Sequence, residues 1–189
     1  TQGWQMFQSP LYYLISAFLW NIPLSQWFDT TTAMLLLRII PLLCGFLQVE
    51  LTYRAVRYVF PNRQELQIWG TIIGGLLPMN LYISHVVGNE PLSGLLSTCA
   101  VVVGFLLLTS EQEVIPDRYF ILMGAALGLA LLTKVSAVLL VPMAVMLVIY
   151  VLDKKRQSIR YIALRVFLVS GIIIVISGWY YLRNWMELG

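Results

Sequence analysis

Charged side chains are scarce in this sequence. Its 189 residues include 12 Lys or Arg and 9 Asp or Glu, together 11% of the chain, while 59% is hydrophobic. Soluble domains carry about 25% charged residues, and a soluble fold of this composition would expose apolar patches large enough to cause aggregation. The scarcity of charge therefore excludes a soluble domain and gives no basis for nucleic-acid binding. We predict an all-α integral membrane protein.

Histidine and cysteine are almost absent as well. His85 is the single histidine, and both cysteines, Cys44 and Cys99, lie in apolar segments. Without a CxxC pair or a Cys/His cluster there is no disulfide framework and no zinc motif, so we interpret the cysteines as small buried hydrophobes. His85 and Glu90 could both contact a divalent metal, but two ligands do not make a site. The sequence contains no Ser/His/Asp pattern, P-loop or dinucleotide fingerprint.

The apolar sequence divides into segments of membrane length. About 20 helical residues cross a hydrocarbon core of about 30 Å. Single spans are predicted at residues 32–49, 66–83, 92–108 and 162–179. Residues 119–152 are too long for one span and contain a single charge, Lys134, near the middle. We predict two short helices there with a turn near residues 134–136, which gives about six crossings. Gly124 and Gly128 give this pair a small-residue face for close packing.

The first 28 residues differ from the rest because they are rich in aromatic side chains. Their apolar stretch from Leu11 to Leu24 is interrupted by Asn21 and Pro23 and is short for a span. Aromatic residues favour the membrane–water boundary, so we predict an interfacial or re-entrant helix. Residues 1–28 are then part of an extracytoplasmic loop, and residues 29–189 form one helical bundle. The absence of an initial Met and the abrupt C-terminus lead us to expect a fragment of a longer chain.

The distribution of basic residues predicts the topology. Most of them lie in or beside two polar loops: Arg54, Arg57, Arg63, Lys154, Lys155, Arg156, Arg160 and Arg165. The positive-inside rule places these loops in the cytoplasm. The remaining unusual polar residues then share the extracytoplasmic side of the plasma (inner) membrane: Gln8, His85, Asn89, Glu90, Arg183 and Asn184.

Three charged residues are the main functional candidates. Glu90 lies between Asn89 and Pro91, a pattern typical of a helix start, where the macrodipole stabilises a carboxylate. It could equally bind a metal, a sugar hydroxyl or a cation at the rim of a cavity. Lys134 requires a partner, a polar cavity or access to the interface, because a lone ammonium in an apolar run is costly. Arg183 could anchor a helix end or bind a phosphate through its guanidinium.

Five short stretches, in order along almost the whole chain, match motifs of one enzyme family. They are Gln8-Ser9-Pro10-Leu11-Tyr12-Tyr13, Leu37-Arg38-Ile39-Ile40-Pro41, Asn89-Glu90-Pro91-Leu92, Gly128-Leu129-Ala130-Leu131-Leu132-Thr133-Lys134 and Gly178-Trp179-Tyr180-Tyr181-Leu182-Arg183-Asn184-Trp185. The chain thereby resembles the N-terminal membrane portion of the polyprenyl-phosphate-sugar-dependent glycosyltransferases of GT-C type. These enzymes are related to protein O-mannosyltransferases and to the lipid A aminoarabinose transferase.

The resemblance implies a GT-C fold and inverting transfer of a sugar from a polyprenyl-phosphate donor to a lipid, glycan or protein acceptor. Glu90 would be a catalytic carboxylate, although the family's main general base is expected upstream of Thr1, so this fragment should be inactive alone. The implied contacts to the lipid phosphate or donor are Lys134, Arg183, Gln8, Tyr12 and Tyr13. His85 and Asn89 would contact the acceptor or a metal. Gln8 and Ser9 depart from the family, which commonly has charged residues or His there.

Two other functions are consistent with the same residues. The chain could be a transporter or channel segment in which Lys134, Arg38 and Glu90 line a solute path. It could also be an inactive GT-C-like subunit of an assembly. Transporters place their charged residues and broken helices near the midplane, whereas the candidates here gather toward one face. This difference favours the enzyme, while the identities of sugar and acceptor stay open.

Overall fold

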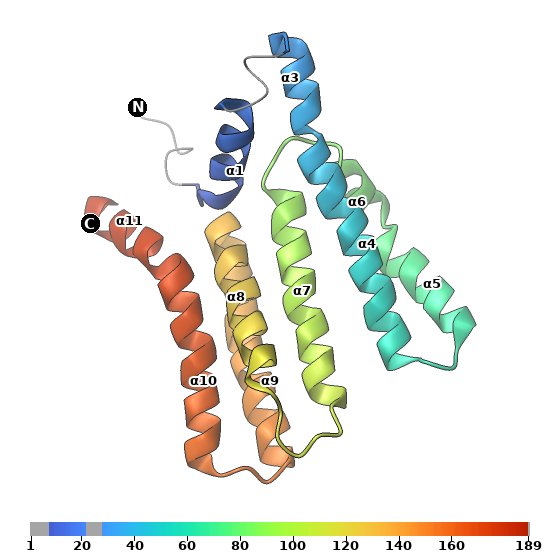
Figure 1. Cartoon of the computed structure of the whole chain (residues 1–189), viewed down its shortest axis with the longest axis vertical. Helices are drawn as coiled ribbons and strands as arrows, with labels where there is room; N and C mark the ends of the chain where they lie inside the picture. Colours follow the sequence, from blue (N-terminus) through green and yellow to red (C-terminus); the bar gives the residue numbers. More distant parts are fainter. Residues whose placement is uncertain (1–7, 22–27, 189) are drawn as a thin grey trace.

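The computed structural model describes residues 8–21 and 28–188, and every regular element in these ranges is helical (Figure 1). The prediction of an all-α chain is therefore confirmed. The α-helices are α1 (Leu11–Leu19), α3 (Thr30–Leu37), α4 (Ile39–Val59), α5 (Gln64–Gly75), α6 (Pro78–Ile83), α7 (Glu90–Thr109), α8 (Asp117–Thr133), α9 (Leu140–Lys154), α10 (Ile159–Ile173) and α11 (Trp179–Leu188). A 3₁₀ turn (Val135–Leu139) joins α8 to α9, and a π-helical turn (Ile174–Gly178) joins α10 to α11.

The long helices run side by side, so the molecule has two distinct ends. The connections α4–α5, α7–α8 and α9–α10 lie toward the lower end in Figure 1. We call this the loop end. The α6–α7 connection, the α8–α9 turn, α1 and α11 lie toward the opposite end, which we call the site end. The predicted interfacial helix corresponds to α1; its flanking residues 1–7 and 22–27, with the predicted break at Pro23, lie outside the described residues.

Within residues 8–21 and 28–188, four helical stretches are long and apolar enough to cross a membrane by length and composition. They are Thr30–Val59, Glu90–Thr109, Val135–Lys154 and Ile159–Glu187. Large hydrophobic side chains on them are exposed, including Phe46 at 70% and Val175 at 78%. Such a surface suits contact with lipid and not with water. The predicted span 66–83 is divided into α5 and α6, because Pro78 has no N–H to continue the helix before it.

The turn predicted near residues 134–136 is confirmed. Helix α8 ends at Thr133, and Lys134 adopts an extended backbone with φ −155° and ψ 130°. The chain then reverses through the 3₁₀ turn into α9. The reversal places the single charge of this apolar run at the end of a helix, where it can reach polar partners.

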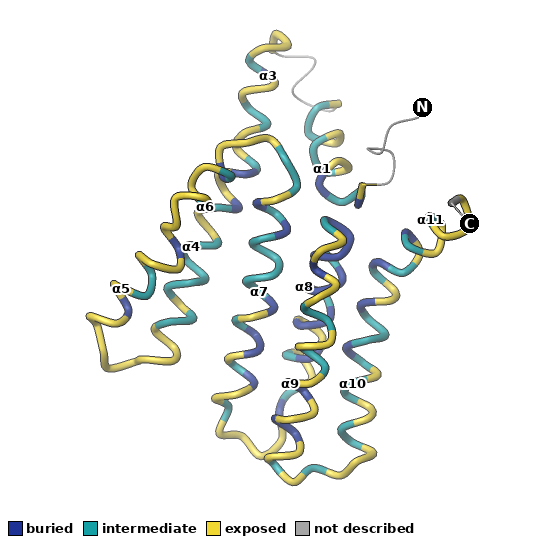
Figure 2. Tube along the Cα trace, turned by 180° about the vertical axis from the view of Figure 1, so that it is seen from behind, coloured by how far each residue is buried: buried dark blue, intermediate teal, exposed yellow. Residues whose placement is uncertain are grey.

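The core lies around α8. Phe120, Leu127 and Val148 are fully buried between α8 and its neighbours, and Figure 2 shows buried positions concentrated along α8 and exposed ones along α5. Helix α10 approaches closely because α8 presents Gly124 and Gly128. A Cβ added at Gly124 would lie 3.0 Å from Ile172 Cβ, and one at Gly128 would lie 2.9 Å from Ile176 Cβ. This fixed core holds the end of α8, and with it Lys134, in position.

Candidate functional site

A polar cavity of about 240 Å³ lies at the site end, among α4, α6, the first turns of α7 and the α8–α9 turn. Its polar lining comes from segments far apart in sequence: Gln48, Asn80, Ser84, Glu90, Ser93, Ser97, Lys134 and Ser136. Polar and ionisable groups among membrane-spanning helices are costly and usually mark functional sites. The cavity is therefore the candidate site.

Glu90 and Lys134 form an ion pair in this cavity. The Lys134 Nζ lies 2.5 Å from both carboxylate oxygens of Glu90. Glu90 is the first residue of α7, and Lys134 follows the last residue of α8. Each charge thus lies at the helix terminus whose macrodipole stabilises it, the carboxylate at an N-terminus and the ammonium at a C-terminus. Their side chains are 48% and 35% exposed, so a ligand entering the cavity can reach both.

Asn89 strengthens the same junction. Its Nδ2 donates a hydrogen bond of 3.2 Å to the carbonyl of Thr133, one of the terminal carbonyls that an α-helix leaves without an internal partner. The sequence predicts Asn89 as the N-cap of α7. It occupies that position, but its side chain makes no capping bond to its own helix. Two successive residues, Asn89 and Glu90, therefore hold two successive residues, Thr133 and Lys134.

Two glycines allow neighbouring helices to bring polar groups to the cavity. A Cβ added at Gly94 would lie 3.0 Å from the Gln48 Oε1, and one at Gly45 would lie within 2.7 Å of the Ser84 side chain. The sequence-based candidates did not include Gln48, Asn80 or the cavity serines. The available signal was an amide, Gln48, inside an apolar span, since polar side chains in such spans face the bundle interior or a polar cavity.

The candidates on α1 and its N-terminal flank lie outside the lining of this cavity. The Tyr13 hydroxyl donates a hydrogen bond to the Gln8 Oε1. Tyr12 is 2% exposed, and its burial raises the pKa of the phenol, although Ser16 and the backbone of Gly88 lie close to its hydroxyl. Tyr12 therefore packs α1 against the segment that leads into Glu90.

Arg183, His85 and Arg38 also lie away from the cavity lining. Arg183 Nε is 3.3 Å from Glu187 Oε1, one turn along α11. His85 is exposed and its Nδ1 lies 2.7 Å from the carbonyl of Leu81. Arg38 is exposed at the junction of α3 and α4. Within the described ranges no three His, Cys, Asp or Glu side chains cluster to hold a metal.

A family model described as "Predicted membrane protein (DUF2142)" matches residues 4–184. The chain belongs to this family. Family membership and the four long apolar helices agree that this DUF2142 chain is a membrane protein. No curated protein and no solved structure matches it.

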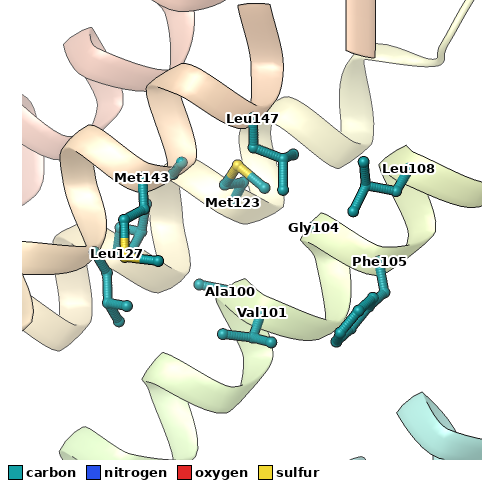
Figure 3. Close-up of a pocket in the computed structure, with 11 residues that line it drawn as sticks. Ala100, Val101, Gly104, Phe105, Leu108, Met123, Leu127, Met143 and Leu147 are labelled. Atoms are coloured by element: carbon teal, nitrogen blue, oxygen red, sulfur yellow. The ribbon is translucent and has the colours of Figure 1, made fainter. Parts of the chain in front are cut away.

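The DUF2142 chain has a second cavity nearby, and its lining is apolar. This cavity of about 200 Å³ lies between α7 and the α8–α9 hairpin (Figure 3). Helix α7 contributes Ala100, Val101, Gly104, Phe105 and Leu108, and the hairpin contributes Met123, Leu127, Leu140, Met143, Ala144 and Leu147. Helix α7 therefore lines a polar cavity with its first two turns and an apolar one with its later turns.

Proposed function

We propose that this DUF2142 chain is the membrane part of a GT-C-type glycosyltransferase that takes its sugar from a polyprenyl-phosphate donor. The observation that carries the proposal is the Glu90–Lys134 ion pair in a polar cavity at one end of an apolar bundle. Transfer to an acceptor from a lipid phosphate requires a carboxylate to accept a proton and a cation to stabilise the departing phosphate. The cavity has both groups within reach of one ligand.

The ion pair is the resting state of the site in this mechanism. A donor phosphate competes with Glu90 for Lys134, so binding of the donor releases the carboxylate. The acceptor hydroxyl or amine then attacks the anomeric carbon on the face opposite the phosphate. A bond forms from the acceptor to that carbon, and the bond from the carbon to the phosphate oxygen breaks. The acceptor proton moves to Glu90, and the electron pair stays on the phosphate, beside Lys134.

The neutral walls of the cavity suit a sugar ring. Gln48 and Asn80 carry amides that both donate and accept hydrogen bonds, and Ser93 and Ser97 carry hydroxyls that do the same. Ligand pockets for drug-sized molecules occupy about 300–1,000 Å³. A cavity of about 240 Å³ therefore favours one sugar unit over an oligosaccharide.

The proposal includes a topology of about six crossings, with α5–α6 and α8 as short spans. The basic residues near the α4–α5 and α9–α10 connections favour the cytoplasm for the loop end. The polar cavity then opens to the extracytoplasmic side of the plasma (inner) membrane. Arg183, on α11 at this end, is proposed to bind the donor phosphate after leaving Glu187. Gln8 and Tyr13 are further donor contacts that the family resemblance implies.

The helix break at Lys134 favours one alternative, a transporter segment. Transporters commonly bind substrates where a helix is interrupted, and α8 stops at Thr133 beside the polar cavity. In that case Glu90 and Lys134 would bind a solute that passes through without chemical change. The two functions differ in one measurable respect, because transfer cleaves the bond between sugar and phosphate and transport does not.

The test uses the full-length protein in liposomes, because the family resemblance implies a further carboxylate upstream of Thr1. Radiolabelled polyprenyl-phosphate sugars are offered one at a time. We expect release of the lipid phosphate, with loss of turnover in both Glu90→Gln and Lys134→Ala. The matched controls are Glu50→Gln, an exposed carboxylate paired with Arg54 on α4, and Lys154→Ala at the loop end. Both controls should retain turnover. Unchanged turnover in the two site variants would remove these residues from the mechanism, and uptake of intact sugar without cleavage would favour a transporter.

A further inference from the structure

We propose that the apolar cavity of Figure 3 holds the hydrocarbon chain of the lipid whose phosphate binds Lys134. The isoprenoid chain enters from the bilayer between α7 and α9, while the headgroup occupies the polar cavity. The identity of the headgroup rests on the function proposed above. The position of the chain follows from the arrangement of the two cavities along the helices.

Both cavities lie along one face of α7. With 3.6 residues per turn, positions three and four apart share a face of a helix. Six of the ten α7 residues that line the two cavities follow this spacing without interruption: Glu90, Gly94 and Ser97 in the polar cavity, then Val101, Gly104 and Leu108 in the apolar one. One stripe therefore begins with a carboxylate, continues with a hydroxyl and ends in hydrocarbon.

The α8–α9 hairpin repeats this change of polarity on the opposite wall. Lys134 and Ser136 line the polar cavity at the turn. Leu140, Met143 and Leu147 of α9 line the apolar cavity further along. Since both walls change from polar to apolar in the same direction, the two cavities match the two parts of an amphiphile: an anionic head beside an ammonium and a chain beside hydrocarbon.

The apolar cavity fits a chain and not a polar group. Its lining is hydrocarbon and thioether, so a buried hydroxyl or amide there would lack a hydrogen-bond partner. Met123 and Met143 supply flexible side chains that adapt to an irregular ligand. Gly104 keeps the space open, because the nearest atoms to an added Cβ are Leu147 Cδ1 at 3.4 Å and Met123 Cε at 3.8 Å. These distances are ordinary contacts for a Cβ, so the side-chain atoms of a larger residue at position 104 would take up space in the cavity.

The experiment maps where a lipid chain lies by photo-crosslinking. The protein in nanodiscs is labelled with a polyprenyl phosphate that carries a diazirine in the middle of its chain, and the modified residues are located by mass spectrometry. A phosphatidylglycerol with a diazirine at the same depth serves as the comparison probe. The variants are Gly104→Leu, which fills the cavity, Lys134→Gln, which removes the cation, and Gly171→Leu. Gly171 is the matched control because it lines a different groove on α10 and an added Cβ meets no atom within 4 Å.

We expect the polyprenyl probe to label residues 100–108 and 140–147. Labelling should fall roughly tenfold in Gly104→Leu, because displacing two methylene groups from an apolar site weakens binding by about that factor. It should also fall in Lys134→Gln and stay unchanged in Gly171→Leu. Labelling outside these residues would overturn the proposal. It would also be overturned if the polyprenyl phosphate and the phosphatidylglycerol labelled the cavity equally and Lys134→Gln did not change that labelling. The map of the unaltered protein decides the question even if Gly104→Leu does not fold.

The readout does not require sugar transfer, so this proposal and the proposed function fail separately. Labelling of the cavity in a full-length protein that cleaves no donor would refute the glycosyltransferase and leave the lipid site. Sugar transfer by a protein labelled elsewhere would refute the lipid site and leave the enzyme.

Discussion

Replacing Asn89 with Ala should loosen the junction that holds Lys134. The substitution removes one donor, the Asn89 Nδ2, from the carbonyl of Thr133, a residue with no exposed surface. Leaving a buried polar group unsatisfied costs about 1–3 kcal/mol. The 3.2 Å bond is at the long end of the normal range, so we expect a loss of about 1–1.5 kcal/mol in the free energy of unfolding. Because Lys134 is the next residue, sugar transfer should fall as well.

The assay is unfolding in mixed micelles of dodecyl maltoside and SDS, followed by tryptophan fluorescence. Asn184→Ala provides a matched control, because the Asn184 Oδ1 is buried and accepts no hydrogen bond. This control should change the unfolding free energy less than Asn89→Ala does. If Asn89→Ala unfolds at the same SDS fraction as the original protein, the bond to Thr133 does not hold the junction, and the reasoning from helix-end carbonyls is refuted.

Two further predictions concern the framework around the site. Gly128→Ala should lower the free energy of unfolding by about 1–2 kcal/mol, because a methyl group 2.9 Å from the Ile176 Cβ overpacks the contact between the helices. The higher helix propensity of Ala recovers only about 1 kcal/mol of this loss. In the same SDS assay the control Gly171→Ala, whose added methyl group lies in open space, should be neutral or stabilising. At the start of α3, hydrogen bonds from Thr32 lower the pKa of Asp29 below its ordinary value of 3.8. The Asp29 carboxylate therefore stabilises the start of α3 above pH 3.8, and this stabilisation is lost as the pH falls through the lowered pKa. An NMR titration of the Asp29 carboxyl with a midpoint at or above 3.8 would contradict the prediction.

Local features of the fold could be predicted from sequence because each depends on neighbouring residues. The turn at Lys134 followed from a single charge in an apolar run too long for one span. The small-residue face of α8 followed from the spacing of Gly124 and Gly128. Both predictions use the cost of placing a charge in lipid or the geometry of one helix, and neither requires knowledge of which helix is adjacent.

The membership of the site was harder to predict because it depends on contacts between distant segments. Glu90 and Lys134 were both candidates, but their pairing joins residues 44 positions apart. Arg183 was an equally plausible cation, yet it pairs with Glu187 one turn away, where two side chains on one helix are always neighbours. Gln48 was missed because the sequence does not show which neighbouring helix a single amide in an apolar span faces.

The reversal at Lys134 has a consequence for how the chain is made. Both ends of the α8–α9 hairpin lie at the loop end of the bundle. In the proposed topology its tip therefore has to cross the bilayer during biosynthesis carrying an ammonium group. Translocating a lysine to the membrane centre costs about 2.5–3.5 kcal/mol, and the carboxylate that offsets this cost belongs to the preceding helix. Glu90 is synthesised before Lys134. In the proposed topology the Glu90 carboxylate is therefore already at the site end when the hairpin inserts, and its negative charge should lower the cost of moving Lys134 across the membrane.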